Sequence, residues 1–188
     1  MKSIALPLAA AAALAACTQS NVNVSAVSYT PLYYPQLVSY VTQGGQLATV
    51  VRGNPFGPGP VDADAIAAAL PLPNAAAPFR YRAMTPDAAR KSARLVLVFG
   101  PAAAGPGDSD TCNNAQDEPI VPGGGPVAVK AVFCVGPNWT STLYASGPPA
   151  RDPRDPQFQA LMNQVIASLM PEDQPLSDRG TGGGTGFQ

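Results

Sequence analysis

The chain contains no histidine among its 188 residues. This absence excludes Ser-His-Asp and Cys-His catalysis, histidine-ligated zinc, and the side chain that most often moves protons near neutral pH. Carboxylates remain as catalytic groups, but Asp62 and Asp64 lie where a helix should begin. Ser92 and Lys91 could form a catalytic Ser-Lys pair only if their side chains met. They are adjacent, and adjacent side chains of a strand point to opposite faces. We therefore predict that the protein is not an enzyme, with no catalytic residues, no metal site and no cofactor.

Charge is also scarce, because only 12% of the residues are charged and the 11 basic side chains nearly balance the 12 acidic ones. A nucleic-acid-binding domain would be strongly basic. The composition therefore predicts no nucleic-acid partner. The longest apolar run, residues 4–16, is too short to cross a bilayer as a helix.

That apolar run belongs to a typical export signal, with Lys2 before it and small residues at its end. Its ending, Leu14-Ala15-Ala16-Cys17, resembles the lipobox of bacterial lipoproteins. The resemblance implies that signal peptidase II removes residues 1–16 and that Cys17 carries a diacylglyceryl anchor. Thr18 stands where an aspartate would imply inner-membrane retention, so the resemblance implies the periplasmic face of the outer membrane. The alternative is an ordinary secretory signal cut after Ala-x-Ala.

Two cysteines, Cys112 and Cys134, remain after Cys17. Export places them in an oxidising compartment, where a single pair predicts a disulfide. A metal or redox pair is the alternative, but the spacing is neither Cys-x-x-Cys nor a zinc pattern.

The composition changes along the chain in a way that predicts one domain. After the signal peptide (1–16), the small polar residues of 17–28 predict a flexible, lipid-anchored tether. Residues 29–170 are enough for a single domain with its own core. The polar, glycine-rich residues 171–188 predict a disordered tail.

Hydrophobic periodicity within 29–170 predicts an α+β fold with long Gly/Pro-rich loops. A small antiparallel sheet is expected, with two main helices covering one of its faces. Residues 100–126 show no periodicity, and we predict a long loop held in place by Cys112. The expected strands are 46–52, 79–82, 95–99, 127–135 and 139–145, and the expected helices are 62–70 and 155–169.

Half of the mature domain's basic residues fall within 15 positions: Arg80, Arg82, Arg90, Lys91 and Arg94. Such a cluster predicts binding to an anionic envelope component, namely phospholipid headgroups, lipopolysaccharide phosphates or an acidic protein. The alternative is a solvated edge strand that its charges protect from aggregation.

Other polar segments have simpler interpretations. One loop holds oxygen ligands that calcium uses, but its spacing differs from that of an EF-hand, so a solvated loop is expected. Its residues are Asp108, Asp110, Asn113, Asn114, Asp117 and Glu118. The tyrosine-rich segment 29–35 is expected to pack on its own domain, with docking of a partner as the alternative.

The function predicted from these features is a non-catalytic binding or scaffold module of the cell envelope. An accessory subunit of a larger envelope assembly is the alternative, using the Tyr29–Tyr34 segment or the uncharged face of the last helix. That face comprises Gln157, Gln159, Asn163, Gln164 and Ser168. A hydrolase without histidine is the third interpretation.

Overall fold

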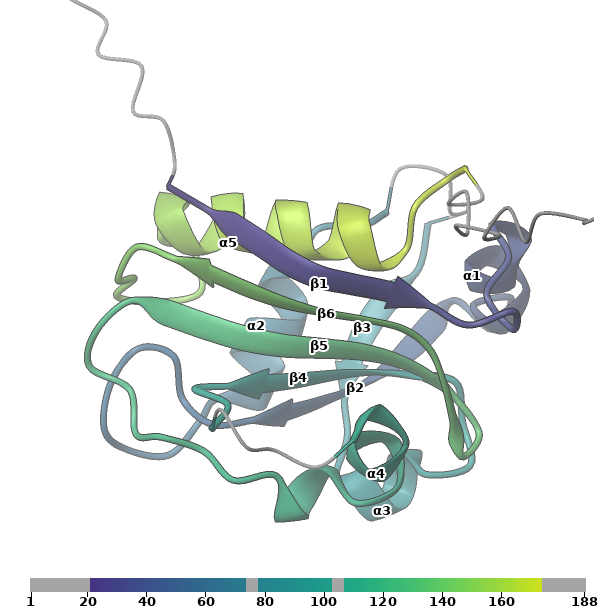
Figure 1. The fold of residues 1–188 in the computed structure, drawn as a ribbon, viewed down its shortest axis with the longest axis horizontal. Helices are drawn as coiled ribbons and strands as arrows, with labels where there is room; N and C mark the ends of the chain where they lie inside the picture. Colours follow the sequence, from purple (N-terminus) through teal and green to yellow (C-terminus); the bar gives the residue numbers. More distant parts are fainter. Residues whose placement is uncertain (1–20, 74–77, 103–106, 174–188) are drawn as a thin grey trace, which may run out of the picture.

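The computed structural model describes residues 21–73, 78–102 and 107–173. They form a six-stranded mixed sheet with helices on both faces (Figure 1). The predicted signal peptide, the lipidation site Cys17 and nearly all of the predicted C-terminal tail lie outside the described residues. Within the described part, no helix is long and apolar enough to cross a membrane.

The strands lie in the order β1-β6-β5-β4-β2-β3. Their bounds are β1 Asn23–Tyr29, β2 Gln46–Arg52, β3 Arg80–Ala83, β4 Arg94–Phe99, β5 Val127–Val135 and β6 Asn138–Gly147. Four neighbours, β1, β6, β5 and β4, pair antiparallel, whereas β2 runs parallel to both β4 and β3. The α+β class is therefore correct, and the prediction of an antiparallel sheet is wrong for β2 and β3.

The parallel strands follow from the connections between them. Parallel neighbours need a crossover, usually through a helix. Helix α2 (Ala63–Ala69) connects β2 to β3, and the short helix α3 (Pro86–Ala89) connects β3 to β4. The sequence places a helix in the first connection, but it does not say on which side of β4 the strand β2 should lie.

Strand β4 is the centre of the core, as its continuous apolar run predicts. All six of its residues are buried, and it is hydrogen-bonded to β2 on one side and β5 on the other. Leu95, Leu97 and Phe99 point to one face, and Val96 and Val98 point to the other. A strand that is apolar on both faces requires a cover on each of them.

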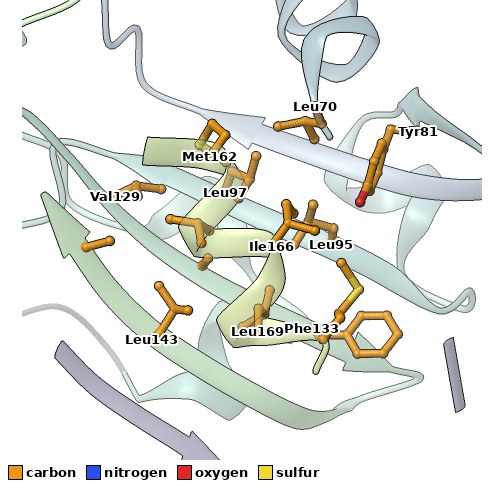
Figure 2. Packing of buried hydrophobic residues seen from close by; sticks show 14 of the residues in the cluster. Leu70, Tyr81, Leu95, Leu97, Val129, Phe133, Leu143, Met162, Ile166 and Leu169 are labelled. Atoms are coloured by element: carbon orange, nitrogen blue, oxygen red, sulfur yellow. The ribbon is translucent and has the colours of Figure 1, made fainter. Parts of the chain in front are cut away.

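The first face is covered by α5 (Pro156–Leu169), with help from α2 and α1 (Gln36–Val41). Figure 2 shows Met162 and Ile166 of α5 beside Leu97 and Leu95 of β4, and Leu169 beside Phe133 of β5. The helices begin where their caps predict. The Asp62 carboxylate accepts a hydrogen bond from the Ala65 amide, and the Asp155 carboxylate accepts one from the Gln157 amide.

The second face is covered by α3, α4 (Asp108–Asn113) and a 3₁₀ turn at Ala115–Asp117. Figure 1 shows α5 on one side of the sheet and α3 and α4 on the other. Two main helices do share one face, as predicted, but the opposite face is not open. The predicted loop 100–126 was expected to lack periodic structure; it contains α4 and the 3₁₀ turn instead.

The predicted tether over 17–28 is wrong in its second half, because residues 23–29 form the edge strand β1. The alternation Asn-Val-Asn-Val places Val22 and Val24 against the core cluster, which a flexible linker would not do. The pairing with β6 shifts register between Ser25 and Ser28, where Ala26 has a φ of 53°. This is a β-bulge, and the small polar residues around it hide the strand pattern in the sequence.

The predicted disulfide is confirmed: Cys112 on α4 is bonded to Cys134 on β5, with the two Cα atoms 5.8 Å apart. The residues are 22 apart in sequence. Reduction is expected to lower the free energy of unfolding by about 3 kcal/mol, because the unfolded chain regains its loop entropy. Urea unfolding with and without reductant measures this change in stability. The variant Cys112→Ala/Cys134→Ala, which cannot form the disulfide, gives a second measurement. An unchanged midpoint in both would contradict it.

Candidate functional site

The predicted basic cluster is divided by the fold. Arg80 and Arg82 lie on the edge strand β3, and both side chains are exposed. Arg82 stands beside Ala48 of β2, which packs on the side of the sheet that carries α3 and α4. Tyr81, between the arginines, points to the other face and packs in the main core. No acidic side chain of the described residues forms an ion pair with either arginine.

Arg90 and Lys91 follow α3 and are exposed. The Arg90 guanidinium is 3.1 Å from the Asp87 carboxylate, and both side chains are largely open to solvent. Such a pair contributes little to stability and leaves the guanidinium accessible. These two side chains therefore remain on the surface at the end of α3, on the side of the sheet that α3 and α4 cover.

Arg94 is not part of that surface, so its assignment to the anionic-binding cluster is wrong. It is only 1% exposed. Its guanidinium donates hydrogen bonds to the carbonyls of Arg90, Ser92, Cys112 and Gly136. Burial, and secondly the charge of Arg90, lower the pKa of Arg94. A guanidinium has five N–H donors in a rigid fork, and here it bonds carbonyls from three separate segments of the chain beside the disulfide.

The acidic loop also folds differently from the expected solvated segment. Glu118 is 1% exposed, and its carboxylate lies 2.9 Å from the ammonium group of Lys130, which is equally buried. Asp108 is 3.6 Å from the same ammonium group. Among the described residues, no three acidic or cysteine side chains are grouped as a metal site would require.

Thr111 connects this ion pair. Its hydroxyl accepts a hydrogen bond from Lys130 Nζ at 2.6 Å and donates to Glu118 Oε1. The sequence does contain one signal for this arrangement, since Lys130 interrupts an otherwise apolar strand. A lysine in a central strand must be paired if it is buried.

A hydroxyl beside a lysine resembles a nucleophile and its base, but two features oppose that role. Thr111 is fully buried, so no substrate reaches its oxygen. Lys130 is equally buried, and its ammonium group is already paired with the Glu118 carboxylate at 2.9 Å. The interactions of Thr111, Lys130 and Glu118 instead hold α4 and the 3₁₀ turn against the second face of the sheet.

The tyrosine-rich segment packs on its own domain, as expected. Tyr33 is buried and its hydroxyl donates to the carbonyl of Pro171 at 2.8 Å. The Tyr29 hydroxyl donates to the carbonyl of Ser168, and burial raises the pKa of both phenols. Tyr34, in contrast, is exposed, together with Leu32 and with Tyr40 of α1.

The uncharged face of α5 is only partly free. Asn163 and Gln164 are exposed. Gln159 is half-buried, and its amide donates to the carbonyls of Ala69 at 2.9 Å and Pro153 at 2.6 Å. Gln159 therefore connects α5 to the end of α2, and its amide group is used in hydrogen bonds within the domain.

A hollow of about 330 Å³ lies beside the exposed arginines, between α2 and β3. It is lined by Gln46, Asp64, Ala67, Ala68, Arg80, Tyr81, Arg82 and Ala83. The two arginines of β3, with Gln46 and Asp64, form the polar part of this lining, and three alanines form its small apolar part. Of the residues predicted to bind anions, Arg80 and Arg82 line this hollow.

Comparison of the chain with protein-family models, curated protein sequences and solved structures finds no match.

Proposed function

We propose that the protein is a lipid-anchored module on the periplasmic face of the outer membrane, where it binds or scaffolds an envelope component without catalysis. The observation that carries this proposal is the leader ending in Leu14-Ala15-Ala16-Cys17. The Cys112–Cys134 disulfide supports it, because such bonds persist in oxidising compartments outside the cytoplasm.

The start of β1 limits how far the domain stands from its anchor. Six peptide units separate Cys17 from Asn23, which reach at most roughly 20 Å when fully extended. In the lipidated protein, the start of β1 would therefore lie within roughly 20 Å of the anchored cysteine.

The arginines lie at the other edge of the sheet. β1 and β3 are the two edge strands, and four strands lie between them (Figure 1). Five strand spacings amount to about 24 Å. This arrangement favours a partner that approaches β3 from the periplasm, and it gives less support to the headgroups of the anchoring membrane.

A subunit of a larger assembly is the second candidate function. It is supported by Leu32, Tyr34 and Tyr40, which are 53%, 42% and 65% exposed around α1. Exposed aromatic and leucine side chains gathered in one region are typical of protein contacts. Purification in detergent separates the two functions, since a subunit co-purifies with a stoichiometric protein partner and a free binder is recovered alone.

Cys17→Ser tests the anchor. The variant is expected to lose its acyl groups and to appear in the soluble periplasmic fraction, or to remain unprocessed, because signal peptidase II acts on the lipidated cysteine. Intact-mass measurement of the wild-type protein should show a mature start at Cys17 with added acyl mass. A mature start without that mass contradicts the lipoprotein assignment, and Cys112→Ala/Cys134→Ala, which keeps Cys17, serves as the control for fractionation.

A further inference from the structure

One edge of β3 has no strand partner among the residues that the structure describes. Among the described strands, β3 pairs with β2 alone. The amides of Arg80 and Met84 donate to Gly45 and Thr49 carbonyls, at 3.0 and 2.9 Å, and so point toward β2. Because backbone groups alternate along a strand, the N–H and C=O groups of Tyr81 and Ala83 point outward. An extended chain can pair with them as a seventh strand.

The side chains of β3 present different chemistry to the two faces of such an added strand. Arg80 and Arg82 share one face, about 6.6 Å apart by the two-residue repeat of a strand. Side chains of neighbouring strands that share a face lie opposite each other. Acidic residues at alternate positions of the added strand would therefore meet the two guanidinium groups, which bind carboxylates through paired hydrogen bonds.

The other face of the added strand would lie over the hollow between α2 and β3. Its walls include Ala67 and Ala68 of α2 and Tyr81 of β3. Small apolar walls leave room for an aliphatic side chain between the two acidic ones. Asp64 is the one acidic residue in this lining, and it belongs to α2, which covers the face of the sheet opposite to that of Ala48 and Arg82.

We infer that the β3 edge binds an extended acidic polypeptide by strand addition, with acidic residues at alternate positions and small aliphatic residues between them. The inference extends the proposed function by giving the chemistry of the partner. It does not depend on the lipid anchor, because the binding surface lies within the described domain.

Binding of capped, fluorescein-labelled peptides to Cys17→Ser protein tests the inference by fluorescence polarisation. The alternating peptide Thr-Glu-Val-Glu-Val-Glu-Thr is expected to bind at least about tenfold more tightly than Glu-Glu-Thr-Val-Val-Thr-Glu, which has the same composition without the alternation. Equal binding of the two peptides, or no binding of either, overturns strand addition.

Two variants separate charge from backbone pairing. Arg80→Glu/Arg82→Glu is expected to weaken binding of the alternating peptide by about tenfold or more, whereas Arg151→Glu/Arg154→Glu makes the same charge change at exposed residues of another loop and should not. Ala83→Pro removes an outward amide without changing charge and should also weaken binding. Near-ultraviolet circular dichroism confirms that each variant is folded.

Two other results would contradict strand addition at β3. If Ala83→Pro binds as tightly as the wild-type protein, the arginines act without strand addition and the inference is wrong. If the domain binds phosphatidylglycerol vesicles or lipopolysaccharide in a salt-sensitive way but not the alternating peptide, the partner is an anionic surface. Neither result bears on the anchor, which the Cys17 mass measurement tests separately.

Discussion

Lys130→Met is expected to lower the free energy of unfolding by about 3–5 kcal/mol, because it leaves the Glu118 carboxylate buried without its cation. The carboxylate has no route to solvent: Glu118 is 1% exposed, and its Oε2 atom already has no hydrogen-bond partner among the described residues. Urea denaturation followed by circular dichroism measures the change.

A double-mutant cycle makes this prediction specific. Adding Glu118→Leu to Lys130→Met removes both charges, and the double variant should recover much of the lost stability, since a buried ion pair replaced by apolar groups is often neutral. Lys91→Met, at an exposed lysine, is the matched control and should leave the midpoint nearly unchanged. A loss below about 1 kcal/mol for Lys130→Met would show that the pair is not buried as described.

The ion pair helps to attach the connection between β4 and β5 to the sheet. The connection from β4 to β5 is long and has few apolar residues to bury, with Cys112 and Ala115 in the second core cluster. Hydrophobic burial alone offers little to hold such a segment. The disulfide and the Thr111–Lys130–Glu118 network supply the attachment instead, and they act at neighbouring points of α4 and the 3₁₀ turn.

Locally encoded features of this fold could be predicted from the sequence. Strands 46–52 and 127–135 have the predicted bounds, and the last helix lies between Asp155 and Pro171 as its cap and proline indicate. These elements depend on periodicity, caps and turns within a few residues. The disulfide was also predictable, because Cys112 and Cys134 are the only cysteines after the predicted leader and its Cys17.

Whether an individual charged side chain is buried or exposed could not be predicted in this way. Arg80 and Arg94 look alike in sequence, yet one is exposed on an edge strand and the other is buried beneath a turn. The difference depends on which distant segment covers each position, and for Arg94 that segment includes Cys112 and Gly136. One local signal was available, because Arg94 directly precedes a run that is apolar on both faces.

The parallel pairing of β2 also depends on contacts between residues that are far apart in the sequence. Local patterns define a strand but not its neighbours, and the chain had to place β2 beside β4, across a connection that contains β3. The hollow beside Arg80 and Arg82 results from that order, since it lies between β3 and the crossover helix α2. The candidate site was therefore predictable as a charged strand and not as a concave surface.

Val165→Asp is expected to destabilise the domain by about 4 kcal/mol or more, because it places a carboxylate in the main core without a partner. Val165 is fully buried, and its neighbours on α5, Met162, Ile166 and Leu169, pack in the main core between α5 and the sheet (Figure 2). Leu161→Ala, at a residue 1% exposed, should cost about 2–5 kcal/mol through the cavity that it leaves.

The control for Val165→Asp lies one residue away on the same helix. Gln164→Asp introduces the same carboxylate at an exposed position and should change the free energy of unfolding by less than about 0.5 kcal/mol. Gln159→Ala, which looked equally harmless in sequence, should cost about 1 kcal/mol, since its two hydrogen bonds to Ala69 and Pro153 are lost. Urea unfolding of all four variants measures these differences. Equal, small losses at Val165 and Gln164 would mean that α5 does not cover the sheet.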